Sequence, residues 1–375
     1  MATETSSANC MFWNPASLIG LIERGMIPGP LLRFGIRRLL WQRLASLPVN
    51  DCEAAADYFD GFIKQMDEAP VALIPEKANE QHYEVPESFF GAVLGCNRKY
   101  SSGYWPEGTA SLDEAEAAAL KMTCERAGLK NGQDILELGC GWGSLTLWMA
   151  GRYPESRITA VSNSHSQRTY ILVEAAQRGL QNVDVITCDM NQFRTDKSFD
   201  RIVSVEMFEH MRNWREVFHR INGWLNPGGL FFMHIFVHRT LPYLFTVEDD
   251  SDWMSRHFFS GGMMPSDDLP AHFQDSLRLV RQWRWNGQHY EKTASAWLAN
   301  MELFKKHLCV VALFGFIGGP LAFYAGSALG ALTLTPERGL AAIAVGWGLL
   351  MPILMLIARR FDGINPLSDK IFNNP

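Results

Sequence analysis

Three glycines at alternate positions, Gly139, Gly141 and Gly143, constrain the fold of this 375-residue chain more than any other feature. They follow the apolar segment 134–138 and precede the helix-forming segment 144–152. Because glycine lets the backbone turn sharply and approach a ligand closely, this order predicts a ligand site at the end of a buried strand. The spacing GxGxG differs from the dinucleotide pattern GxGxxG and favours a nucleoside ligand without a pyrophosphate.

Helical and apolar segments alternate on both sides of this loop. The further strands expected are 158–161, 183–187, 201–205 and 230–236, the helices are 112–127, 144–152 and 167–179, and a turn is expected at 226–229. This alternation predicts an α/β fold with a doubly wound parallel sheet that carries helices on both faces. Glu137 lies near the end of the first strand, where its carboxylate suits a cationic amino-acid group through charge-assisted hydrogen bonds.

Charge is distributed unevenly along the chain. The chain has 34 basic and 40 acidic residues and a net charge of -6, which argues against a general nucleic-acid-binding protein. Residues 307–358 include only two charged residues, so the apolar runs 308–334 and 339–358 are each long enough to cross a bilayer. Basic residues at both outer ends predict a membrane-anchoring hairpin of two transmembrane helices, with the catalytic domain facing the cytoplasm. The alternative is a buried helix pair in a soluble core.

The N-terminal region and the cysteines indicate the cellular compartment in which the protein is expected to function. Residues 1–10 are polar and lack a basic region, so no signal peptide is expected. Residues 28–47 alternate apolar side chains with four arginines, which fits either a helix on a membrane surface or a helix covering the substrate. The seven scattered cysteines form no CxxC pair, which indicates reduced thiols in a cytosolic compartment and predicts no metal site.

Three titratable residues follow the fourth expected strand: Glu206, Glu209 and His210. Ligands of open α/β sheets bind at the carboxyl ends of the strands, and in a short helix these side chains share one face. Such a cluster could supply a base near neutral pH. The alternative is a helix-capping acid with a structural histidine.

The segment 137–143 resembles motif I of class I S-adenosylmethionine-dependent methyltransferases. The whole chain resembles the cyclopropane-fatty-acid synthase superfamily, closest to its coclaurine N-methyltransferase-like branch. The matching segments run in family order and are 81–86, 99–104, 139–143, 206–211, 258–265, 289–290 and Trp297. The resemblance implies a class I, Rossmann-like methyltransferase fold. The domains expected are an N-terminal helical cap (1–110), a catalytic domain (111–304) with a cap insertion near 240–290, the hairpin (305–360) and a tail (361–375).

The resemblance also implies S-adenosylmethionine as the cofactor. The residues expected to bind it are Tyr100, Ser101, Glu137, Gly139, Gly141, Ser162, Asn163, Gln167, Asp189 and Met190. For Asn163 and Asp189, a role as loop caps is the alternative.

Methyl transfer to an amine nitrogen of a small aromatic or apolar acceptor is the activity that the resemblance implies. In related N-methyltransferases, the pair matching Glu209 and His210 positions the amine and helps its proton leave, and we expect Glu206 to join it. The residues expected to face the acceptor are Glu84, His234, Phe258, Phe259 and Tyr290.

Two other functions remain open. A cyclopropane synthase or fatty-acyl methyltransferase would act on lipid, and there His234 and Tyr290 match bicarbonate-site positions. However, Ser102 replaces the synthase cysteine, and Ser260 stands where synthases tend to carry proline. The other alternative is a catalytically impaired membrane adaptor that keeps the fold. Relatives end in an antiparallel strand that is not identifiable here, so we expect either an incomplete sheet or a sheet whose final strand is replaced.

Overall fold

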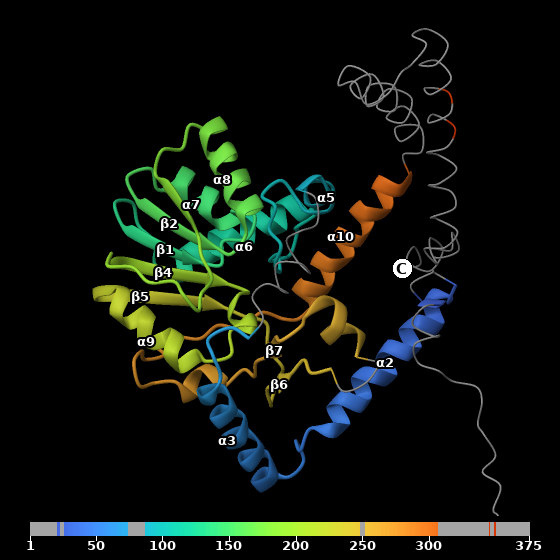
Figure 1. Ribbon diagram of the computed structural model, residues 1–375. Coiled ribbons are helices and arrows are strands. Elements are labelled where there is room, and N and C mark those ends of the chain that lie inside the picture. Colours follow the sequence, from blue (N-terminus) through green and yellow to red (C-terminus); the bar gives the residue numbers. More distant parts are fainter. Residues whose placement is uncertain are drawn as a thin grey trace, which may run out of the picture. The chain divides into compact units, whose positions relative to one another are not determined.

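The structure is a computed structural model, and it describes residues 21–22, 26–73, 87–247, 252–306, 345 and 349 (Figure 1). The chain divides into two compact units, one from Leu47 to Met301 and one made of residues 1–46 and 302–375. Apart from residues 345 and 349, the expected membrane segments 308–334 and 339–358 lie outside the described residues, as does the tail 361–375. Among the helices that are described, none is both long and apolar enough to cross a membrane.

Five parallel strands form the sheet of the larger unit, in the order β3-β2-β1-β4-β5. The strands are β1 (Asp134–Leu138), β2 (Arg157–Ser162), β3 (Val183–Thr187), β4 (Phe199–Val205) and β5 (Leu225–His234). Leu138 lies opposite Val161 on β2 and Ser204 on β4, so the carboxyl ends of the central strands are level. The predicted class of fold is confirmed.

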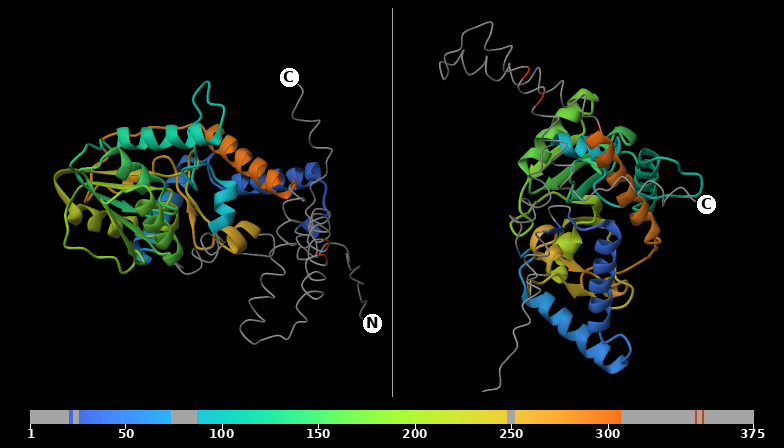
Figure 2. Two further views of the ribbon diagram at one scale, coloured as in Figure 1. Left: turned by 90° about the horizontal axis from the view of Figure 1, so that it is seen from above. Right: turned by 90° about the vertical axis from the view of Figure 1, so that its right-hand side faces the viewer.

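Helices cover both faces of this sheet, as Figure 1 and the further views in Figure 2 show. One face carries α6 (Leu112–Arg126), α7 (Ser144–Arg152) and α8 (His165–Gln177), and the other carries α9 (Trp214–Trp224), against which α3 (Cys52–Glu68) packs. Successive residues of a strand point to opposite faces of the sheet. Ile135 packs with side chains of α6 and α7, whereas Leu136 joins the cluster that includes Trp214.

The last strand differs from its prediction. The segment 226–229, expected as a turn before the strand, lies inside β5, which begins at Leu225. A register shift opposite Phe199 and Arg201 and the positive φ of 77° at Gly228 accommodate these residues within the strand. In the described part of the chain β5 pairs only with β4, so its outer edge has no strand partner there.

Short elements lie outside the sheet. They are α5 (Glu87–Val93), η1 (Phe208–His210), β6 (Tyr243–Leu244), η2 (Met254–Phe258), β7 (Met263–Met264) and η3 (Leu269–His272). The longer helix α10 (Gln288–Lys306) follows them in the chain. β6 and β7 form a two-stranded antiparallel sheet inside the expected cap insertion near 240–290. In the smaller unit, α2 (Gly29–Ser46) confirms the helix expected near 28–47 and buries none of its residues.

Candidate active site

The glycine loop after β1 takes the conformation that only glycine adopts readily. Gly139, Gly141 and Gly143 have φ values of 79°, 50° and 77°. A Cβ atom on Gly139 would lie 2.7 Å from Cγ of Met207, and one on Gly143 would lie 2.5 Å from Cγ1 of Ile171. A Cβ atom on Gly141 would meet no atom within 4 Å. Two of the glycines are therefore required by close packing, and the third leaves space beside a cavity.

This cavity lies at the carboxyl ends of the strands and brings together all ten residues predicted to bind the cofactor. Glu137 and the glycines border it from β1 and its loop, and Ser162 borders it from the end of β2. The remaining members of the predicted set that line it are Tyr100, Ser101, Asn163, Gln167, Asp189 and Met190. Their contact with a cofactor stays a prediction.

Glu206 and His210 also line this cavity, which places the predicted titratable cluster beside it. Glu206 has a φ of 48°. Its Oε1 accepts the backbone N–H of Ser102 at 2.9 Å, and its Oε2 accepts the hydroxyl of Tyr290 at 3.1 Å. Burial raises the pKa of Glu206, while the nearby charge of Lys99 lowers it. These contacts connect the end of β4 to the loop after α5 and to α10.

Glu209 lies behind the cavity wall and does not line the cavity. It is completely buried, and its Oε1 accepts the backbone N–H of Phe236 at 2.8 Å. Its Oε2 has no hydrogen-bond partner among the described residues. Burial and the neighbouring Glu206 raise the pKa of Glu209 well above its ordinary value. The two neighbouring carboxyl groups therefore disfavour a state in which both are ionised.

The structure brings only some of the residues predicted to face the methyl acceptor close to the predicted catalytic cluster. Phe259 is buried and its ring centroid lies 4.4 Å from that of His210. The ring of Tyr290 packs 6.4 Å from Phe236, whereas Phe258 is 39% exposed. Glu84 lies outside the described residues.

His234 does not line the cofactor cavity. Its ring lies 4.8 Å from that of Trp285. Burial, reinforced by the charges of Lys99 and Arg126, lowers the pKa of His234 to about 3, which keeps the ring neutral.

Comparisons with known proteins fit this geometry. The family described as mycolic acid cyclopropane synthetase matches residues 74–313. The chain belongs to this family. (S)-coclaurine N-methyltransferase from Thalictrum flavum subsp. glaucum is 36% identical over 294 residues, which cover 77% of this chain and 81% of that relative. The cyclopropane-fatty-acyl-phospholipid synthase of Escherichia coli (strain K12) is 30% identical over 220 residues, covering 58% of this chain and 54% of that relative.

A solved structure supports the same assignment. The crystal structure of coclaurine N-methyltransferase bound to N-methylheliamine and SAH matches with a TM-score of 0.75 and 31% identity, covering 93% of this chain and 95% of that one. A second family, described as a protein of unknown function (DUF2878), matches residues 293–353. The predicted family is thus confirmed, and this member of the synthetase family is an S-adenosylmethionine-dependent methyltransferase.

The cavity of this methyltransferase offers polar groups suited to its cofactor. Ser162 Oγ donates to Gln167 Oε1 at 2.6 Å, and Nε2 of the buried Gln167 has no partner among the described residues. That amide can donate to a hydroxyl of the ribose. Asp189 already accepts the backbone N–H of Asn191 at 2.9 Å, so the alternative role as a loop cap is also present.

Glu137 fits the cationic end of the cofactor. It is 3% exposed, accepts the Thr146 hydroxyl at 2.5 Å, and has a pKa raised to about 8 by burial. A cationic amino group beside it would compensate the carboxylate and lower that pKa. The S-adenosylmethionine sulfonium supplies the electrophilic methyl group, while these residues bind and orient.

Sequence reasoning missed Lys99. It lines the cavity and is 3% exposed, although it directly precedes the predicted pair Tyr100 and Ser101. A lysine beside polar residues is normally taken as a surface side chain, because isolated buried ammonium groups are costly. The available signal was its place as the first residue of the matched segment 99–104.

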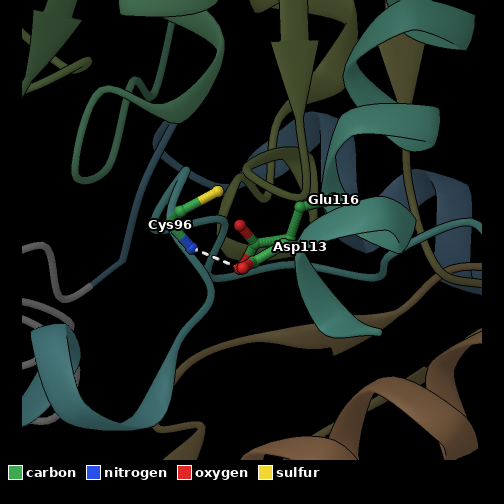
Figure 3. Close-up of side chains that lie close together, drawn as sticks. All are labelled: Cys96, Asp113 and Glu116. Atoms are coloured by element: carbon green, nitrogen blue, oxygen red, sulfur yellow. Dashed lines mark hydrogen bonds between the residues drawn. The ribbon is translucent and has the colours of Figure 1, made fainter. Parts of the chain in front are cut away.

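A group of three potential metal ligands, Cys96, Asp113 and Glu116, lies near this loop (Figure 3). Asp113 Oδ1 accepts the Cys96 backbone N–H at 2.6 Å. Glu116 accepts three backbone N–H groups, from Gly95, Asn97 and Lys99. The carboxylates therefore serve to fold the 95–99 loop.

Proposed function

We propose that this enzyme transfers the methyl group of S-adenosylmethionine to the nitrogen of a small apolar or aromatic amine. The observation that carries the proposal is the cluster of Glu206, Glu209 and His210: Glu206 and His210 line the cofactor cavity, and Glu209 is buried behind its wall. The similarity to (S)-coclaurine N-methyltransferase supports an amine acceptor.

Methyl transfer needs a neutral amine, because an ammonium group has no lone pair. The nitrogen lone pair forms the new N–C bond while the S–C bond breaks, and its electron pair stays on sulfur. Glu206 attracts the amine at the cavity wall, and His210 takes up the proton that the nitrogen loses. Glu209, buried behind the cavity wall, influences the protonation of Glu206 and His210 through its own charge. Positioning and exclusion of water supply the rest of the rate enhancement.

A lipid acceptor is the second candidate. The similarity to the Escherichia coli synthase and the apolar run after residue 307 favour it. Against it, Ser102 stands in place of the synthase cysteine and donates its hydroxyl to the Gly103 carbonyl at 3.0 Å. His234, at a bicarbonate-site position, packs on Trp285 instead.

One experiment distinguishes amine methylation, lipid modification and the third alternative, a catalytically impaired membrane adaptor that keeps the fold. Calorimetry first measures binding of S-adenosylmethionine; the full chain is then incubated with methyl-labelled cofactor, an amine panel and unsaturated phospholipids. We expect label in a methylated amine. Label recovered only in acyl chains would exclude N-methylation, and absence of cofactor binding would favour the adaptor.

A substitution tests the role of Glu209. Glu209→Gln keeps the oxygen that accepts the Phe236 N–H, and we expect about 100-fold slower amine methylation with unchanged cofactor binding. The exposed Glu155→Gln is the control. Unchanged turnover in Glu209→Gln would remove the residue from the mechanism.

We further propose that residues 308–334 and 339–358 anchor the enzyme in a membrane, with the catalytic domain facing the cytoplasm. The near absence of charge in 307–358 and the basic pairs at 305–306 and 359–360 support this. The full chain should stay in the membrane pellet after carbonate extraction. Its recovery in the supernatant would exclude the anchor.

A further inference from the structure

Lys99 is a buried cation whose contacts the proposed chemistry has not used. Its Nζ donates to Ser101 Oγ at 2.5 Å and to the Ser102 carbonyl at 2.7 Å. Both acceptors belong to the loop that borders the cofactor cavity. The ammonium therefore fixes the same short loop whose Tyr100 and Ser101 are predicted to touch the cofactor.

Ser102 joins Lys99 to the carboxylate cluster. Its carbonyl accepts from the Lys99 ammonium, and its backbone N–H donates to Glu206 Oε1 at 2.9 Å. Ser102 is thus held from both sides, by the buried Lys99 ammonium and by the half-buried Glu206 carboxylate. The two opposite charges stabilise each other across this residue.

Several other groups contribute to the charge around Lys99. Glu116 of α6 accepts the Lys99 backbone N–H at 3.3 Å and is itself held by two more amides. The groups facing this cluster from the other elements are Glu209 on η1, His234 on β5, Tyr290 on α10 and Tyr100 on the loop itself. His234 is neutral, and burial raises the pKa of both tyrosines, so neither tyrosine is charged at neutral pH. The carboxylates are therefore the groups that the Lys99 charge offsets.

We propose that Lys99 is a positioning residue that sets the charge of the acceptor-side carboxylates. Its positive charge favours the ionised form of Glu206, and its hydrogen bonds to Ser101 and Ser102 fix the loop that borders the cofactor cavity. This inference rests on the proposed amine methylation for its effect on turnover. The effect on the loop does not depend on the acceptor.

The test compares three variants of the full chain. Lys99→Gln removes the charge but keeps a hydrogen-bond donor, Lys99→Arg keeps the charge, and Lys130→Gln changes an exposed lysine as a control. Turnover with methyl-labelled cofactor and an amine acceptor is measured against pH. Calorimetry with S-adenosylhomocysteine measures binding without any acceptor, and circular dichroism confirms folding.

Loss of the positive charge should raise the pKa of Glu206. We expect the acid limb of the kcat/KM profile of Lys99→Gln to move to higher pH by about one unit, with Lys99→Arg and Lys130→Gln close to the parent. A uniform loss of kcat without movement of the limb would reduce Lys99 to a structural residue and overturn the proposal.

The binding measurement separates this proposal from the proposed function. A fourth variant, Lys99→Met, removes both charge and donors and should bind S-adenosylhomocysteine about tenfold more weakly. If no amine is methylated but this loss appears, amine methylation fails and the positioning of the loop stands. Unchanged binding in folded Lys99→Met would overturn the loop part of the proposal.

Discussion

The two halves of the active site are built differently. On the cofactor side, the loops that follow β1 and β2 each belong to a local unit of strand, loop and helix, and the loop after β3 leads directly into β4. On the acceptor side, Glu206 contacts Ser102 and Tyr290, residues 104 and 84 positions away in the chain. The cofactor half is therefore specified by local sequence, whereas the acceptor half depends on tertiary contacts. Substitutions in each half should separate binding of the cofactor from turnover.

The largest effect is expected on the acceptor side. Glu206→Gln keeps an oxygen for the Ser102 N–H but removes the charge that attracts the amine. We expect about a 1000-fold loss of kcat/KM for the amine, with binding of S-adenosylhomocysteine within about threefold of the parent. Steady-state kinetics and calorimetry measure the two. A parallel loss of both would contradict the division into halves, and Glu155→Gln is the control.

On the cofactor side, Gly139→Val should weaken binding of S-adenosylhomocysteine about 100-fold. A β-branched residue at a φ of 79° is strained, and its Cβ would lie 2.7 Å from Met207 Cγ. Calorimetry measures the loss. The matched control is Gly223→Ala in α9, where a Cβ meets no atom within 4 Å. Equal behaviour of the two variants would show that the loop has no special conformation.

Gln167→Leu should weaken cofactor binding less than Gly139→Val, and it tests whether Gln167 belongs to the cofactor half of the site. The substitution removes the unpartnered Nε2 that we expect to donate to the ribose and leaves the Ser162 hydroxyl without its acceptor. The Kd of S-adenosylhomocysteine should rise about tenfold, while kcat at saturating cofactor stays close to the parent. A fall in kcat without a change in Kd would assign Gln167 to the acceptor half instead.

The smallest effect concerns pH. Burial raises the pKa of Glu137 from 4.5 to about 8, so its contribution to folding is complete below pH 4.5 and is lost as the pH rises towards 8. In Glu137→Gln, the free energy of unfolding should therefore fall less steeply with pH over this interval. Urea unfolding without cofactor measures both slopes. Identical slopes would mean that Glu137 is not buried in the free protein.

The same division explains what the sequence predicted. β1, α7 and β3 have the predicted bounds, since each follows from a short apolar or helical pattern. The predicted start of β5 was wrong, because pairing with β4 keeps the proline-glycine segment 226–229 within the strand. The burial of Lys99 was not predictable, because the cavity that it lines is also built from residues of β1, β2 and β4. The position of Glu209 behind the cavity was not predictable either, because its carboxylate accepts the N–H of Phe236, which lies beyond α9 and β5.

The left-handed backbone at Glu206 has an evolutionary consequence. A side chain other than glycine costs about 1 kcal/mol in this conformation. Glu206→Gly would relieve that strain, but it would leave the Ser102 N–H and the Tyr290 hydroxyl without their acceptor. A single substitution here therefore exchanges one cost for another, which restricts the routes by which this position can change.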